Sequence, residues 1–360
     1  GQAQRHQRAA VKEGCCMCQL FGANDVLGTW SRFTSYYHTL KNLTLTYSLI
    51  STNKKTKKSL CRCQFVWCVA NSCHLLMEVH LALNGHLRTI LVDMCRFLLY
   101  IGNSMFVGDV VVHPQNSLIR QARNATYHPG VSDPLNKRNI VVNGDGFGLA
   151  WYDKEDPGKG SCIFKFTTPA WSDGNLRSIG DHVSSSLIFA HVRAASDGHD
   201  PSEFVSVSYE NCHPFKRGRY TFMHNGCIPE FNLIKKKIVT HLTDRTYLSI
   251  TGSTDSEYIF ALILHYLDES PGGACTNENG EELEYCMTKL IDSVEKSFAF
   301  IIHLLQGASE TRGSSKEPLR ASLNICISDG VNTIVSRFRS GVKGSKDSQP
   351  PSLYYSYGDS

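Results

Sequence analysis

Met94 and Cys95 form the pair of residues whose order most directly suggests a reaction. If processing removes Met94, Cys95 carries a thiol beside its own free α-amine. That amine has an ordinary pKa of about 7.7 to 8.0 and accepts the thiol proton near neutral pH, so one residue supplies both nucleophile and base. The apolar run that follows, up to Ile101, predicts a buried strand. The same pair therefore also fits a plain strand start with a core cysteine.

Polar residues stand at the ends of two further apolar segments. Arg193 ends the run 186–193, which predicts a buried strand, and Asn225-Gly226 follows the run 219–224. Such strand ends are common places for binding sites. The plain alternatives are a surface charge for Arg193 and the tight turn of a β-hairpin for Asn225-Gly226.

A third candidate, Asp255, lies where a helix is expected to begin. Ser253 and Ser256, or Thr254 and Glu257, have the spacing of a capping box, and apolar residues between 258 and 267 recur with a helical period. Asp255 is therefore either a plain helix-cap residue or a carboxylate held at a helix start for binding.

The segment 143–152 joins a glycine-rich turn, Gly144-Asp145-Gly146-Phe147-Gly148, to an apolar strand. A phosphate-binding loop of a dinucleotide enzyme needs a helix directly after its glycines. Because a strand follows here, close packing of the backbone against a site explains these glycines better.

The order of the expected elements favours an α+β fold. A short helix is expected over 117–123, with Ser117 or Asn116 as its cap. Strands are expected over 94–101, 147–152, 163–166, 186–193 and 219–224, helices over 229–242, 253–267 and 281–296, and strands again over 297–302, 323–327 and 333–338. Runs of strands, then helices, then strands favour α+β layers over an alternating parallel sheet.

The charge of the chain divides at residue 94. Residues 1–93 contain 11 Lys and Arg against 4 Asp and Glu, a balance of +7, whereas residues 94–360 have a balance of −3. The basic part lacks sustained hydrophobic periodicity and contains the solvated charge run 52–59. We therefore expect 1–93 to be a leader that is disordered or not part of the functional protein, and 94–360 to form the functional domain. The acidic balance of 94–360 gives no indication of a nucleic-acid partner.

The cysteines divide in the same place, seven on each side. The pairs Cys16/Cys18 and Cys61/Cys63 lack the two-residue gap of a zinc knuckle, so no metal is expected. The later cysteines are scattered singly, as in a reduced, cytoplasmic protein. The chain has no apolar run of about 18 residues and no apolar segment at its start, so the sequence predicts neither a membrane span nor a secretory signal.

Six motifs, taken together and in order, resemble the class II glutamine amidotransferases, which are N-terminal-nucleophile hydrolases. The motifs are Met-Cys-Arg-Phe at 94–97, Gly-Asp-Gly-Phe-Gly at 144–148, Ala-His-Val-Arg at 190–193, Asn-Cys-His-Pro-Phe at 211–215, His-Asn-Gly at 224–226 and Ser-Thr-Asp-Ser-Glu at 253–257. The resemblance covers about 94 to 338 and is greatest to the stand-alone group that contains the fungal glutathione-degradation subunit. It implies a four-layer αββα sandwich.

The resemblance also implies a role for each candidate residue. Cys95 is similar to the family's nucleophile, whose own α-amine is the base. Asn225, through its side-chain amide, and Gly226, through its backbone N–H, resemble the oxyanion hole. Arg193 matches the residue that binds the substrate α-carboxylate, and Asp255 matches the residue that pairs with the substrate α-ammonium.

Three histidines, His191, His213 and His224, occur within these motifs, and we expect only supporting roles for them. One of them could act as the base of a Cys–His thiol protease. That mechanism is the poorer alternative because it leaves Arg193 and Asp255 without a task.

The activity implied by the resemblance is hydrolysis of a γ-glutamyl amide through a Cys95 thioester, with no cofactor. The implied substrate is glutamine or glutathione, and for glutathione a metallopeptidase-like protein is the implied partner. The chain after Asp255 is too short for the ammonia-consuming domain of a synthase, which favours a stand-alone hydrolase or a catalytic subunit. The alternative from another class is a non-catalytic regulatory or assembly protein that keeps the amidotransferase fold.

Two features depart from the family pattern. Cys95 is internal as written, and an amide nitrogen cannot act as a base, so the 360-residue chain is expected to be inactive unless the leader is removed. Related proteins continue beyond the Tyr354-Tyr355 region with further strands, so the C-terminal edge is expected to be truncated.

Overall fold

Strand β3 (Arg96–Phe106), which begins directly after Cys95, shows why this sequence folds in layers. Its side chains alternate between two hydrophobic clusters: Phe97 and Leu99 pack into one, and Leu98 and Tyr100 into the other. A strand that is apolar on both faces needs cover on both sides. The sequence thus places β3 between a second sheet and a layer of helices.

The structure, a computed structural model, describes residues 46–51, 63–69, 95–124, 142–153, 155–194, 205–269, 285–312, 318–341 and 353–358. All of them fall within the unit Thr44–Ser360, and the unit Gly1–Leu43 lies outside the described residues. Met94 and the leader cysteines Cys16, Cys18 and Cys61 also lie outside them.

Two antiparallel sheets form the interior of the described domain. The first has the strand order β1-β10-β9-β8-β7, and the second has the order β11-β2-β3-β6-β4-β5. The first sheet consists of β1 (Thr46–Ser51), β7 (Phe215–Arg217), β8 (Tyr220–Cys227), β9 (Ser322–Ser328) and β10 (Asn332–Arg337). The second consists of β3 with β2 (Cys63–Val69), β4 (Phe147–Trp151), β5 (Cys162–Phe166), β6 (Ser184–Val192) and β11 (Leu353–Gly358).

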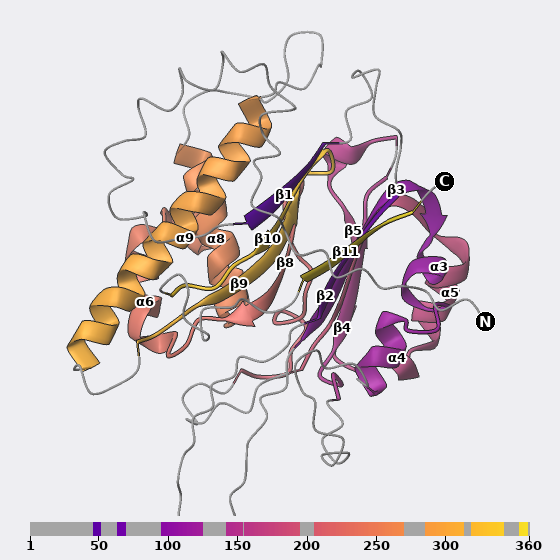
Figure 1. Cartoon of the computed structure of the whole chain (residues 1–360), viewed down its shortest axis with the longest axis horizontal. Helices are drawn as coiled ribbons and strands as arrows, with labels where there is room; N and C mark the ends of the chain where they lie inside the picture. Colours follow the sequence, from indigo (N-terminus) through magenta and orange to yellow (C-terminus); the bar gives the residue numbers. More distant parts are fainter. Residues whose placement is uncertain are drawn as a thin grey trace, which may run out of the picture. The chain divides into compact units, whose positions relative to one another are not determined.

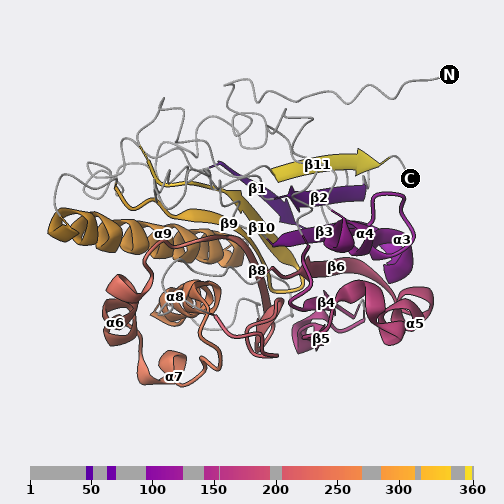
Figure 2. The same cartoon turned by 90° about the horizontal axis from the view of Figure 1, so that it is seen from below.

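Helices cover the outer face of each sheet. The second sheet is covered by α3 (Val107–Val111), α4 (Leu118–Arg123) and α5 (Gly174–His182). The first is covered by α8 (Asp255–Glu269) and α9 (Tyr285–Arg312), with α6 (Asn232–His241) and α7 (Asp244–Tyr247) beside them. Two 3-10 turns, Pro157–Lys159 and Ala170–Ser172, complete the described elements. The layers therefore run helix, sheet, sheet, helix, which is the α+β, four-layer αββα arrangement predicted from the sequence (Figures 1 and 2).

The core between the two sheets is continuous across them. Phe189 of β6 packs in one cluster with Met223 of β8, Cys326 of β9 and Val335 of β10. On the outer side of the first sheet, rings from α8 and α9 pack on it, with centroids 5.1 Å apart for the stacked pair Phe222–Phe260 and 5.3 Å for the tilted pair Phe298–Phe338. Each sheet is thus fixed by contacts on both faces.

Tyr152, which follows β4 of the second sheet, reaches into the first sheet. Its phenolic oxygen lies 2.8 Å from the backbone oxygens of Arg219 and Ser328 and 2.8 Å from Oγ1 of Thr221. Thr221 is near the start of β8, at the opposite end of that strand from Asn225. The two sheets are therefore joined by hydrogen bonds at a point far along β8 from the candidate residues.

Several local predictions are confirmed. The helix predicted over 117–123 forms as α4, and its first turn is capped by Ser117, whose Oγ accepts a hydrogen bond from the Arg120 N–H at 3.3 Å. The strands predicted over 147–152, 186–193, 323–327 and 333–338 form within one or two residues of their expected bounds.

One local prediction and one of the plain alternatives are wrong. Residues 297–302, which we expected to form a strand, lie inside the helix α9. Phe298, Ile301 and Leu305 recur at helical spacing along its buried face, and this tertiary packing decides between helix and strand for a short apolar run. Asn225-Gly226 is no hairpin turn, because both residues lie within β8 and pair with Asn324 and Leu323 of β9.

Two strands lie in the predicted leader, for which the sequence analysis expected no element. Strand β1 pairs with β10, and β2 pairs with both β3 and β11. The short apolar run Phe65-Val66-Trp67 supplies the pairing residues of β2 opposite Leu98, Leu99 and Tyr100. The remainder of 1–93 lies outside the described residues, and the domain boundary at 94 stays a prediction.

None of the helices in the described ranges combines the length and the apolar composition needed to cross a lipid bilayer.

Candidate functional site

Cys95 lies where the antiparallel pairing of two central strands brings a strand start and a strand end together. Arg96 at the start of β3 pairs with Val192 at the end of β6, so Cys95 lies beside the residues that follow β6. The Cys95 Sγ is 3.4 Å from both the N–H and the carbonyl oxygen of Ala194. This pairing places Cys95 next to Arg193 without any special loop.

Asn225 approaches Cys95 from the other sheet. Its Nδ2 donates a hydrogen bond to the backbone oxygen of Cys95 at 2.5 Å, and its Oδ1 is buried with no partner among the described residues. An amide nitrogen carries two N–H groups, so the second remains for a ligand. Asn225 can therefore hold the cysteine backbone and still donate to an oxyanion.

Gly226 follows Asn225 in β8, where a side chain has no room. A Cβ at this position would lie 2.0 Å from the backbone oxygen of Ser322 and 2.8 Å from Nε2 of His224. Because both neighbours are held by strand or ring contacts, only glycine lets β8 approach β9 so closely.

Arg193 is buried, which rules out the surface-charge alternative. Its side chain is 4% exposed, and its Nη2 donates to the backbone oxygens of Val205 at 3.3 Å and Ser206 at 3.1 Å. Nη1 is buried and has no partner within the described part of the chain. A buried guanidinium with an unused donor is suited to binding a carboxylate.

Asp255 is the first residue of α8, and its carboxylate is held by three donors. Oδ1 accepts hydrogen bonds from the Ser256 N–H at 2.7 Å and from its hydroxyl at 3.2 Å, and Oδ2 accepts from the Ile228 N–H at 2.8 Å. The capping role belongs to Thr254, whose Oγ1 accepts from the Glu257 N–H at 3.2 Å. Asp255 is thus not needed as the cap, and its negative charge is favoured at a helix N-terminus.

The charges of Arg193 and Asp255 both act on the Cys95 thiol. Burial raises the pKa of this thiol from 9.0 to about 11, and the Asp255 carboxylate adds to the rise, while the Ala194 hydrogen bond and the Arg193 guanidinium oppose it. At neutral pH the thiolate fraction of such a group is about one in ten thousand. The thiol therefore needs a base, and one positive and one negative side chain act on it with opposite effects on its pKa.

The three motif histidines are not placed as that base. His191 and His213 stack with ring centroids 4.2 Å apart, and burial lowers the pKa of His191 to about 3 and that of His213 well below 6.5. His224 is held at both nitrogens, by the Ser256 hydroxyl at 2.8 Å and the Ser322 backbone oxygen at 3.0 Å. Within the described residues, no histidine hydrogen-bonds to Cys95, which speaks against a Cys–His pair.

The glycine-rich segment packs against the backbone of the site, as its sequence predicts. The Gly146 oxygen accepts from the Arg193 N–H at 2.8 Å, and the Asp145 N–H donates to the Arg193 oxygen at 3.1 Å. Gly146 has a φ of +119°, and a Cβ there would lie 2.6 Å from the Sγ of Cys212. These contacts fix the backbone from which the Arg193 side chain extends.

The sequence analysis gave no role to Asn211 and only a helix-capping role to Glu257, although both lie within the quoted motifs. Asn211 links the segment at Ser206 to the segment at Ser253, and Glu257 accepts hydrogen bonds from Arg217, Thr251 and Gly252. Both side chains are 2% exposed. Their place in the motifs was the only sign in the sequence that they matter, but residue spacing alone does not show which groups they bind.

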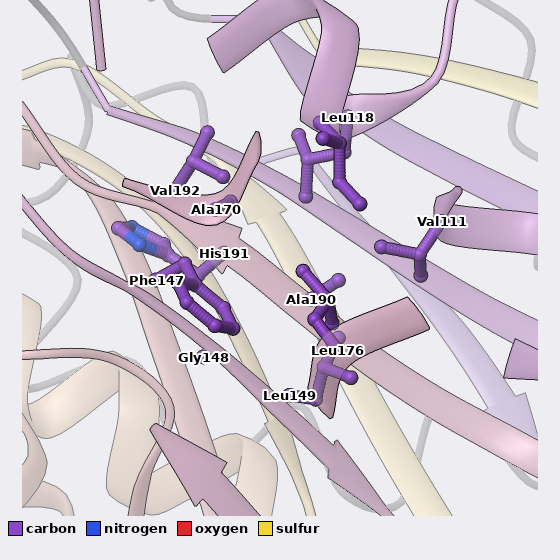
Figure 3. A pocket seen from close by; sticks show the side chains of 11 residues that line it. Val111, Leu118, Phe147, Gly148, Leu149, Ala170, Leu176, Ala190, His191 and Val192 are labelled. Carbon is purple, nitrogen blue, oxygen red and sulfur yellow. The ribbon is translucent and has the colours of Figure 1, made fainter. Parts of the chain in front are cut away.

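A small cavity lies on the other face of β6, under α3, α4 and α5 (Figure 3). Its volume is about 10 Å³, enough for one water molecule and far below that of an amino acid. Its lining is apolar except for His191. Across the described residues, no three His, Cys, Asp or Glu side chains gather as a ligand set for a metal ion.

The structure therefore brings the five predicted site residues together. Cys95 bonds to Asn225, Gly226 follows Asn225, and Arg193 and Asp255 act electrostatically on the Cys95 thiol. Their chemical roles stay predictions.

Comparison with known proteins finds the same family along most of the chain. The profile of the family described as class-II glutamine amidotransferases matches residues 135–309. Probable glutamine amidotransferase DUG3 of Saccharomyces cerevisiae is 34% identical over 270 residues, which cover 74% of this chain and 69% of the yeast protein.

More distant similarity extends to hydrolases and to a solved structure. The γ-glutamyl-hercynylcysteine sulfoxide hydrolase of Mycolicibacterium smegmatis is 24% identical over 170 residues, covering 47% of this chain and 60% of that enzyme. A glutamine aminotransferase class-II domain protein from Silicibacter pomeroyi aligns with a TM-score of 0.41 and 23% identity, over 73% of this chain and 87% of that one. On the extent and identity of the match to the yeast protein, the chain belongs to the class-II glutamine amidotransferases, a family of enzymes.

Proposed function

We propose that this protein is an amidohydrolase that cleaves a γ-glutamyl amide through a thioester on Cys95, once Cys95 is the N-terminal residue of its polypeptide. The observation that carries the proposal is the hydrogen bond from Asn225 to the Cys95 backbone, beside a thiol on which Arg193 and Asp255 both act. This arrangement combines a nucleophile, an oxyanion donor and two charges that match an amino acid.

In the proposed mechanism the two charged side chains bind the α-amino acid end of the substrate. Arg193 donates from its unused Nη1 to the α-carboxylate, and Asp255 accepts from the α-ammonium. The γ-carbonyl carbon then lies against the Cys95 sulfur. Binding through two charges selects an L-glutamyl group over a simple amide.

The reaction itself takes two proton-balanced stages. The α-amine of Cys95 takes the thiol proton, sulfur bonds to the γ-carbonyl carbon, and the oxyanion accepts hydrogen bonds from Asn225 Nδ2 and the Gly226 N–H. The C–N bond breaks as the α-ammonium returns the proton to the leaving nitrogen. Water then gives a proton to the α-amine, attacks the thioester, and releases glutamate with recovery of the thiol.

For the substrate, we propose a γ-glutamyl amide of a cysteine-containing compound, with glutathione as the example and glutamine as the runner-up. The mycobacterial relative is named as a hydrolase of a γ-glutamyl cysteine derivative, and this likeness supports a leaving group larger than ammonia.

For glutathione we further propose a metallopeptidase-like protein as partner. We place the activity in the cytoplasm, because the thiols of Cys95, Cys162, Cys212, Cys227 and Cys326 are free.

The test uses the full chain with a recognition sequence for a site-specific protease placed so that cleavage leaves Cys95 as a new N-terminus. Strand β2 pairs along β3 and with β11, so we expect the upstream piece to stay bound after the cut and the sheet to stay intact. Glutamate release from glutamine and from glutathione is measured before and after cleavage, with intact mass confirming the new terminus. We expect release only from the cleaved protein.

Two matched cysteine variants show whether the glutamate release comes from Cys95 or from a contaminating enzyme. Cys95→Ala removes activity, whereas Cys162→Ser, which changes an exposed thiol on β5, leaves it unchanged. Equal activity of the uncut chain would overturn the requirement for a free amine. A cleaved, folded protein that releases glutamate from neither substrate would instead support the non-catalytic alternative.

A further inference from the structure

We propose that Asn211 is a positioning residue that sets the distance between Arg193 and Asp255 and thereby the selectivity for an α-amino acid. The inference rests on the proposed function, because it deepens the binding step of that same site. Asn211 is 2% exposed and lies between the two segments that hold these charges. It acts through those segments and does not contact the substrate itself.

On the Arg193 side, Asn211 and Arg193 share one acceptor. The Ser206 backbone oxygen accepts from Arg193 Nη2 at 3.1 Å and from Asn211 Nδ2 at 3.0 Å. Asn211 Nδ2 also lies 3.3 Å from the Ser206 hydroxyl. The carbonyl that fixes the guanidinium is therefore itself fixed by Asn211.

On the Asp255 side, Asn211 holds the backbone two residues before the carboxylate. Its Oδ1 accepts from the Ser253 N–H at 2.8 Å, and its Nδ2 lies 3.3 Å from the Ser253 hydroxyl. Ser253 leads through Thr254 into the first turn of α8, where Asp255 lies. A single amide thus connects Arg193 and Asp255 through backbone atoms on each side.

A second buried side chain, Glu257, also holds the segment before α8. Glu257 accepts from the Gly252 N–H at 2.6 Å and from the Thr251 N–H at 3.0 Å. A Cβ on Gly252 would lie 2.4 Å from Asn211 Oδ1 and 2.8 Å from Glu257 Oε2. Gly252 is therefore the residue that lets Asn211 and Glu257 approach the same turn.

This arrangement predicts that loss of Asn211 affects substrate binding and the chemical step differently. An α-amino acid carries its carboxylate and ammonium on one carbon, so both charges are satisfied only when Arg193 and Asp255 keep a fixed separation. The reacting groups, Cys95 and Asn225, lie at the start of β3 and on β8, and they bond to each other and to Ala194 rather than to Asn211. Loss of Asn211 should weaken binding of the amino acid end and leave the chemical step nearly intact.

The first measurement is equilibrium binding to the full, uncut chain carrying Cys95→Ala, which needs no turnover. Calorimetry compares L-glutamate, which has both α-charges, with glutarate, which lacks the α-ammonium. We expect Asn211→Ala to weaken L-glutamate binding at least about tenfold and to bring the ratio of the two affinities close to one. Asn175→Ala, on the exposed face of α5, is the matched control and leaves both affinities unchanged.

The second measurement is steady-state kinetics of the cleaved chain with glutamine. Asn211→Ala should raise KM at least about tenfold with kcat within about threefold of the parent value. If Asn211→Ala fails to fold, Asn211→Asp serves, because it keeps the shape and the acceptor for Ser253 but cannot donate to Ser206. It should also raise KM.

The outcomes separate the two proposals. Unchanged selectivity between L-glutamate and glutarate in a folded Asn211 variant, or a loss confined to kcat, overturns the positioning role and leaves the proposed function standing. Selectivity that depends on Asn211 in a cleaved chain without turnover supports the positioning role and contradicts the proposed function. Absence of L-glutamate binding to the Cys95→Ala chain overturns the positioning role, and glutamate release by the cleaved chain decides the proposed function separately.

Discussion

Asn225 and Cys95 are 130 residues apart in the chain, yet Asn225 Nδ2 lies 2.5 Å from the backbone oxygen of Cys95. The bond joins β8 of one sheet to the start of β3 in the other. It fixes the amide so that its nitrogen, and not its oxygen, faces the cysteine. This orientation is the one that an oxyanion requires.

From this bond we predict that Asn225→Ala lowers kcat of the cleaved chain by roughly two to three orders of magnitude, with a much smaller change in KM, because the lost donor acts on charge that develops during the reaction. Steady-state kinetics with glutamine measures both values, and circular dichroism checks the fold. Asn175→Ala is again the control. A kcat within tenfold of the parent value would exclude Asn225 from the oxyanion hole.

Two glycines should respond to the same substitution in opposite directions. Gly226→Ala forces a Cβ to within 2.0 Å of the Ser322 oxygen, and we expect the free energy of unfolding to fall by at least about 2 kcal/mol. Gly307 lies inside α9, where an added methyl group would meet no heavy atom of the described residues within 4 Å, and Gly307→Ala should raise the free energy of unfolding by about 1 kcal/mol. Urea denaturation compares the two, and equal stability of both variants would refute the steric argument.

The buried Glu257 carboxylate should matter far more than an exposed one. Arg217 donates to Glu257 at 2.6 Å, and the Thr251 and Gly252 N–H groups complete its shell, so Glu257→Gln should lower the free energy of unfolding by about 3 kcal/mol. Asp268→Asn, which breaks an exposed pair with Arg245 at 3.8 Å, should change it by no more than about 0.5 kcal/mol. Thermal and urea unfolding measure both. A Glu257→Gln variant as stable as Asp268→Asn would contradict this assignment.

The stacked histidines predict loss of stability in acid. Burial holds the pKa of His191 at about 3, against 6.5 in the unfolded chain, so between these values the unfolded chain binds a proton that the folded protein does not. The contribution of His191 to the free energy of unfolding is fully present above pH 6.5 and is lost as the pH falls from 6.5 toward 3.

This pH dependence is measured by urea unfolding at a series of pH values. His191→Gln should make the slope between pH 6.5 and 4 shallower, though not flat, because the pKa of His213 is also lowered by burial. His303→Gln, on an exposed position of α9, should leave the slope as it is. Identical slopes for all three proteins would show that His191 is not the responsible group.

The sequence predicted correctly those helices and strands whose structure depends mainly on their own residues. Ser117 caps α4 because a serine hydroxyl satisfies an N–H of the first turn wherever the helix lies, and that signal is visible in the sequence. The apolar run ending at Val192 predicts β6 for the same reason. The layered α+β order followed from the succession of such elements.

Contacts between residues far apart in the sequence decided the structure of the segments that the local sequence pattern did not predict correctly. Asn225-Gly226 has the composition of a turn, but pairing with Asn324 and Leu323 extends the strand through it. The apolar run at 297–302 becomes helical because its neighbours on both sides continue the helical face of α9. The hydrogen bonds of Asn211 to Ser206 and Ser253 likewise depend on chain segments that no spacing rule brings together.

Tyr152 and Asn225 fasten the same two sheets at opposite ends of β8. Because the two sheets are hydrogen-bonded at both ends of β8, they cannot separate at one end by rotating about the other. Rearrangements that admit or release a molecule must therefore take place in the connections around the sheets. Throughout such movements the backbone oxygen of Cys95 keeps its hydrogen bond to the Asn225 amide.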